Sequence, residues 1–144
     1  MHLHRDPLRT LPSQLSLMAT LRWMRCTEVD PLREARAIAK GNAAIFRAVI
    51  EGRARGALPD ERFVDLRFAD LMADTLGAIE SLYERLGWKL GPEARAAMAD
   101  YVARKPRHSR GVHRYTLEEF GLDPAAERER FRFYCEWYAV PEEM

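Results

Sequence analysis

Residues 4–13 read HRDPLRTLPS and indicate a turn from a strand into a helix very near the start of the chain. The preceding residues resemble the end of a strand. Asp6 can cap a helix whose first position is Pro7, because the amide that proline lacks would have no partner there. A turn of this kind usually lies in the middle of a domain, and its position here is therefore unusual.

Apolar residues at helical spacing continue from this turn. The first predicted helix carries Leu8, Leu11, Leu15, Met18 and Leu21 on its buried side, and Pro12 is expected to kink it. Asp30 and Pro31 begin a longer helix that ends near Gly56. Its expected buried side consists of Ala35, Ile38, Ile45, Phe46 and Val49.

The strongest strand pattern lies at residues 64–68, where Val64, Leu66 and Phe68 alternate with charged residues. Helices are expected after Asp74, after Gly91, over the short Thr116–Gly121 segment and after Asp123. A strand, helices, a strand and more helices predict an α/β fold with a partial parallel sheet and flanking helices, mostly helical in this chain. Because such sheets normally have more than two strands, the pattern predicts part of a domain.

The composition limits the classes of function. The 144 residues fit one domain, and 23 Lys and Arg nearly balance 22 Asp and Glu, so no overall field favours nucleic acid or a membrane surface. Cys26 and Cys135 form no CxxC motif, and the chain contains no uncharged run near the roughly 18 residues of a membrane span. We therefore expect a cytoplasmic protein with neither a nucleic-acid nor a membrane partner.

Two places in the sequence could bind an anion. Arg5 follows a strand and precedes free helix amides, and Ser13 lies about two helical turns beyond Arg5. The alternative is that Arg5 pairs with Asp6 or with a carboxylate elsewhere. In the basic stretch 104–115, Arg107, Arg110 and Gly111 could fold over an anion, although the same stretch could equally be a solvated connector.

Other candidate sites have weaker support in the sequence. His4, His108 and His113 lack the spacing of a metal site with Cys or carboxylate partners, so no metal is expected. The last helix is rich in aromatic residues, which favour core packing over base stacking: Phe131, Phe133, Tyr134, Trp137 and Tyr138.

Three segments resemble, in order, the C-terminal half of bacterial sulfotransferase-family proteins. They are HRDPLRTLPS, FVDLRFADLMADTLGAIESLYERLG and HRYTLEEFGLDPAAERERFRFYCE. The resemblance implies a partial P-loop-kinase-like parallel sheet with flanking helices. It also implies that 3'-phosphoadenosine 5'-phosphosulfate (PAPS) is the donor and that Arg5 and Ser13 hold its 3'-phosphate. It also places Phe68, where the family usually has tyrosine, beside the nucleotide. The family's late Arg-Lys-Gly loop corresponds in position to Arg107, Arg110 and Gly111, although the sequence here differs from that motif.

The other half of the family's site has no counterpart in the sequence. The resemblance implies an N-terminal glycine loop with a lysine for the 5'-phosphosulfate, but no Pro-Lys-Ser/Thr-Gly or GxxxxGK[ST] stretch occurs. We therefore expect residues 1–144 to be the C-terminal portion of one sulfotransferase-like domain, inactive alone, with no catalytic residue that can be named.

The expected reaction is sulfuryl transfer to a hydroxyl or amine of a small-molecule acceptor. The alternative is a noncatalytic helical binding or interaction protein derived from the same domain. If the chain is expressed alone, an exposed sheet edge would favour poor solubility or self-association.

Overall fold

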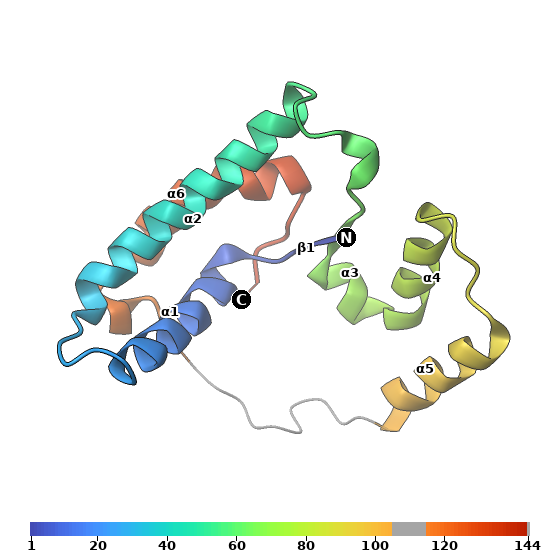
Figure 1. The fold of residues 1–144 in the computed structure, drawn as a ribbon, viewed down its shortest axis with the longest axis horizontal. Helices are drawn as coiled ribbons and strands as arrows, with labels where there is room; N and C mark the ends of the chain where they lie inside the picture. The colour runs from blue at the N-terminus through green and yellow to red at the C-terminus, as the bar shows by residue number, and fades with distance from the viewer. Residues whose placement is uncertain (105–114, 144) are drawn as a thin grey trace. The chain divides into compact units, whose positions relative to one another are not determined.

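The computed structural model describes residues 1–104 and 115–143, which form two compact units (Figure 1). One unit comprises residues 1–4 and 61–104, and we call it the sheet unit; the other, the helical unit, comprises residues 5–60 and 115–143. The elements in chain order are β1 (His2–His4), α1 (Pro7–Trp23), α2 (Pro31–Ala54), the 3₁₀ turn η1 (Asp60–Arg62), β2 (Asp65–Arg67), α3 (Phe68–Ala73), α4 (Thr75–Arg85), α5 (Pro92–Arg104), the 3₁₀ turn η2 (Glu118–Phe120) and α6 (Pro124–Tyr138).

Aspartate side chains begin four of the helices. Asp6, Asp30 and Asp123 each precede a proline and accept a hydrogen bond from the amide two residues later, at 3.0, 3.1 and 3.0 Å. Asp74 caps α4 by accepting from the Gly77 amide at 2.9 Å. These bonds satisfy amides that have no partner within the helix. The four predicted helix starts are confirmed.

The core of the helical unit lies where α1, α2 and α6 meet. Figure 1 shows α2 and α6 side by side, and α1 contacts both. Phe46 of α2 stacks on Tyr134 of α6 with ring centroids 4.5 Å apart. The main cluster of buried residues is Leu11, Leu15, Ala35, Ala39, Leu117, Leu122 and Phe131. This core holds together segments that lie more than 100 residues apart in the sequence.

Two of the predicted core positions are wrong. Leu21 is 43% exposed and Ile45 is 62% exposed. Each helical residue turns by about 100°, so Leu21 lies about 200° around α1 from buried Ala19, and Ile45 lies about 100° from Phe46. The buried stripe is narrower than the apolar pattern predicted.

Helix α1 continues through Pro12, which is buried inside it.

The sheet unit contains a two-stranded parallel sheet. β1 and β2 pair in the register His2 with Asp65 and His4 with Arg67. Phe68 was predicted to continue the strand, but it is the first residue of α3. The alternating pattern of apolar and charged residues did not predict this helix. Arg67 marks the boundary between β2 and α3. Its backbone is extended, and its Nε donates to Asp70 Oδ2 in the first turn of α3 at 2.7 Å.

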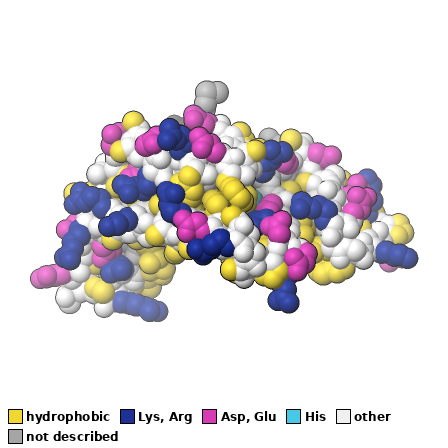
Figure 2. All heavy atoms as spheres, turned by 90° about the horizontal axis from the view of Figure 1, so that it is seen from above, with side chains coloured by type: hydrophobic (Ala, Val, Ile, Leu, Met, Phe, Trp, Pro, Cys, Tyr) yellow, Lys and Arg dark blue, Asp and Glu magenta, His cyan; other side chains and the backbone are white. Residues whose placement is uncertain are grey.

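The surface carries both signs of charge. On the face drawn in Figure 2, basic and acidic side chains are interspersed, so the balance in the composition is also a local balance there. Helices α3, α4 and α5 have no buried residues within the described part of the chain. Among the described helices, none is both long enough and apolar enough to cross a membrane.

Candidate anion-binding site

The turn between β1 and α1 is built around Asp6. Its side chain is fully buried, and its Oδ1 accepts from the Leu8 amide at 3.0 Å, which begins the helix. Arg128 of α6 donates to the same oxygen through Nη1 at 2.9 Å, and the Glu143 amide donates to Oδ2 at 3.0 Å. Because a buried carboxylate must be compensated by donors, these three contacts explain how Asp6 can lie in the interior. They also tie the turn to α6 and to the segment after it.

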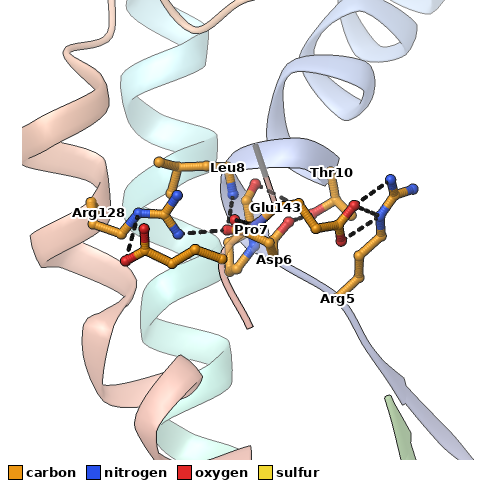
Figure 3. Close-up of polar contacts among 8 residues, drawn as sticks. Arg5, Asp6, Pro7, Leu8, Thr10, Arg128 and Glu143 are labelled. Carbon is orange, nitrogen blue, oxygen red and sulfur yellow. Dashed lines mark hydrogen bonds and ion pairs between the residues drawn. The ribbon is translucent and has the colours of Figure 1, made fainter. Parts of the chain in front are cut away.

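Arg5 is held by Glu143 in the structure. Its Nε lies 2.9 and 3.1 Å from the two carboxylate oxygens, and its Nη2 lies 2.7 Å from Oε2. Figure 3 shows the Glu143 carboxylate facing the Arg5 guanidinium, while Arg128 approaches Asp6 from α6. The ion-pair alternative for Arg5 is therefore present here, with Glu143 as the partner. Such a two-point contact is the geometry with which arginine binds planar oxyanions.

Ser13 lies in the same compact unit as Arg5. It is exposed on α1, and it shares a helix face with exposed Arg9 because the two are four residues apart. The structure therefore places two polar side chains on one solvent-facing stripe of the helix that Arg5 precedes. The role of Ser13 as a ligand remains a prediction.

The other predicted site residues lie elsewhere in the chain. Phe68 is half-buried at the start of α3 and belongs to the sheet unit. Arg107, Arg110 and Gly111 lie outside the described residues. Sequence reasoning missed Arg128 and Glu143, which are 122 and 137 residues from Asp6. No local pattern marks such partners, since only tertiary packing brings them to the turn.

The two cysteines differ in their surroundings. Cys26 is exposed, whereas burial raises the pKa of the Cys135 thiol, and the negative charge of Asp6 raises it further. A raised pKa leaves less thiolate at any given pH, and the thiolate is the reactive form.

We predict that iodoacetamide modifies Cys26 well before Cys135 at neutral pH. The rate at Cys135 should rise as the pH approaches its raised pKa, because the thiolate fraction grows. Mass spectrometry of the Cys26→Ser and Cys135→Ser variants reports each thiol separately. Equal rates at the two thiols would contradict the burial of Cys135.

The comparisons with known proteins agree with this fold. A family model described as "Sulfotransferase family" matches residues 1–92. The chain belongs to the sulfotransferase family. The match includes the HRDPLRTLPS turn and the segment from β2 to α4, and it confirms the family that the sequence resembled.

A solved structure is similar to this sulfotransferase-family chain over almost its whole length. The crystal structure of sulfotransferase STF9 from Mycobacterium avium superposes with a TM-score of 0.78 at 24% identity, covering 97% of this chain. The chain spans 36% of the length of that protein. A search of curated protein sequences found no match. The likeness confirms the predicted fold class, a mostly helical part of a P-loop-like α/β fold.

Proposed function

We propose that this protein takes part in sulfuryl transfer from PAPS to a hydroxyl or amine of a small molecule, and that Arg5 and Ser13 hold the 3'-phosphate of the donor. The observation that carries the proposal is the position of Arg5. It stands between β1 and the capped start of α1, with its guanidinium in a two-point contact with an oxyanion. The family of the chain supplies the class of reaction.

The proposed ligands suit the chemistry of a 3'-phosphate. That group brings up to about two negative charges and several acceptor oxygens, which need more than one donor. Arg5 would supply charge and Ser13 a neutral hydroxyl. The family resemblance adds Phe68 beside the nucleotide, and Arg107, Arg110 and Gly111 as a further contact to the phosphate.

The transfer step itself would need residues that we do not assign in this chain. The bond between sulfur and the bridging oxygen of PAPS breaks, a bond from sulfur to the acceptor oxygen or nitrogen forms, and the acceptor proton passes to a base. Adenosine 3',5'-bisphosphate leaves with the electron pair of the broken bond. Because the sequence has no glycine loop with a lysine, we propose that these residues bind the donor without completing the transfer.

Anion binding would compete with Glu143. The Arg5 side chain is 37% exposed and that of Glu143 24%, so the pair is partly open to solvent, which weakens the attraction between the two charges. A phosphate with a higher charge can therefore displace the carboxylate. We further propose a cytoplasmic location, where PAPS would be the soluble donor.

The test is calorimetric titration with adenosine 3',5'-bisphosphate, which carries the 3'-phosphate but no sulfuryl group. Replacing Ser13 with alanine should weaken binding about tenfold, because a hydrogen bond to a charged group contributes about 1.5 kcal/mol or more. The matched control is Ser81→Ala, which removes another exposed serine from the helix α4.

The outcome also separates the two classes of function. Binding that weakens in Ser13→Ala and not in Ser81→Ala supports a donor site. A folded protein that does not bind the bisphosphate would instead indicate a noncatalytic interaction protein.

A further inference from the structure

Two histidines and an aspartate lie together on the small sheet of the sheet unit. His2 and His4 are two residues apart in β1 and so face the same side, and Asp65 of β2 lies opposite His2 in the register. One ligand atom from each of the three side chains lies within 4.8 Å of the other two. Among the described residues, these three form the group of histidine, cysteine or acidic side chains that lie close enough together to hold one metal ion.

Both imidazoles approach the same carboxylate oxygen. His4 Nε2 lies 2.8 Å from Asp65 Oδ1, and His2 Nδ1 lies 3.9 Å from it. A tetrahedral zinc ion with ligands about 2.0–2.1 Å away holds its donor atoms about 3.3 Å apart. The two observed distances lie on either side of that value, so small side-chain rotations would bring the three atoms to a common metal ion.

The cluster combines a fixed ligand with an opening to solvent. The His4 side chain is fully buried, whereas those of His2 and Asp65 are 33% and 27% exposed. Because the His2 Nδ1 atom itself is buried, an ion would enter from the side of Asp65. The Arg85 guanidinium donates to the backbone carbonyl of Asp65 at 3.0 Å, which fixes the strand from which the carboxylate projects.

We propose that His2, His4 and Asp65 form a binding site for a divalent first-row transition metal ion. Two imidazoles and one carboxylate suit zinc, cobalt or iron(II), and three protein ligands leave a coordination position open to water. The bound ion would link β1 to β2 through side chains in addition to the backbone ladder. The sequence predicted no metal site, because Asp65 is 61 residues from His4 and no ligand spacing connects them.

The proposal is tested with zinc and cobalt on the full chain after treatment with a chelator. Equilibrium dialysis with metal analysis should give one zinc ion per chain, and cobalt should give the visible absorption of a four-coordinate site. His2→Ala and Asp65→Asn should each weaken zinc binding by at least about tenfold. Asp65→Asn keeps an oxygen facing His4, so this variant should fold even if His2→Ala does not.

Matched variants separate this site from adventitious binding. Asp70→Asn makes the same change in the same unit at an aspartate that pairs with Arg67, and it should leave zinc affinity unchanged. Cys26→Ser removes the exposed thiol and should also have no effect. The proposal is overturned if the folded protein binds no zinc, or if binding survives Asp65→Asn. Neither result bears on binding of the bisphosphate, which is measured separately.

Discussion

Replacing Arg5 with alanine is expected to weaken binding of adenosine 3',5'-bisphosphate by at least about 100-fold. The guanidinium would make two charge-assisted hydrogen bonds to the 3'-phosphate, and each such bond contributes about 1.5–3 kcal/mol. Alanine removes both bonds and the positive charge at the start of α1. Calorimetric titration of the purified variant measures the change directly.

Two further variants show whether the loss is specific to Arg5. Arg132→Ala removes an exposed arginine of α6 that pairs with Glu129 at 2.9 Å, and it should leave affinity within about twofold. Glu143→Gln removes the charge of the carboxylate that holds Arg5, so it should strengthen binding. If Arg5→Ala and Arg132→Ala bind equally well, Arg5 is a structural ion-pair residue and the proposed donor site is wrong.

Replacing Asp6 with alanine should lower the free energy of unfolding by about 2–4 kcal/mol. The substitution removes the cap of α1, which contributes about 1 kcal/mol, together with hydrogen bonds from Arg128 and the Glu143 amide. Those two donors would then lie beside an apolar side chain. Urea-induced unfolding followed by circular dichroism gives the change.

The matched control for Asp6 is Asp30→Ala. Asp30 caps α2 with the same proline at the first helical position, but its cap bonds are exposed to solvent. The expected loss is therefore only about 1 kcal/mol, the contribution of the cap alone. Equal losses for the two variants would mean that the contacts of Asp6 with α6 and with the segment after it add no stability.

Helix boundaries followed from short-range chemistry. An aspartate before a proline caps a helix through an amide two residues away, and Asp6, Asp30 and Asp123 do so as predicted. Thr116 and Glu119 exchange their predicted capping-box bonds, with donor–acceptor distances of 3.2 and 3.3 Å. These features depend on neighbouring residues alone, and a single sequence is sufficient to identify them.

Which faces are buried did not follow from the pattern alone. Phe68 continued an alternating pattern but begins α3, and Ile45 fitted a helical stripe but is exposed. Burial depends on which other element lies against each face, and in the helical unit α1, α2 and α6 leave only a narrow stripe covered.

The sequence by itself determined the family, the order of the elements other than η1 and α3, and the turn that carries Arg5, because local capping and the ordered motifs suffice for these. Only the tertiary structure decided the partners of that turn and the neighbours of His4. Glu143 and Arg128 reach Arg5 and Asp6 from the far end of the chain, and Asp65 reaches the histidines from another strand. A side-chain contact depends on distance in space, and packing brings these residues together across separations that sequence spacing does not encode.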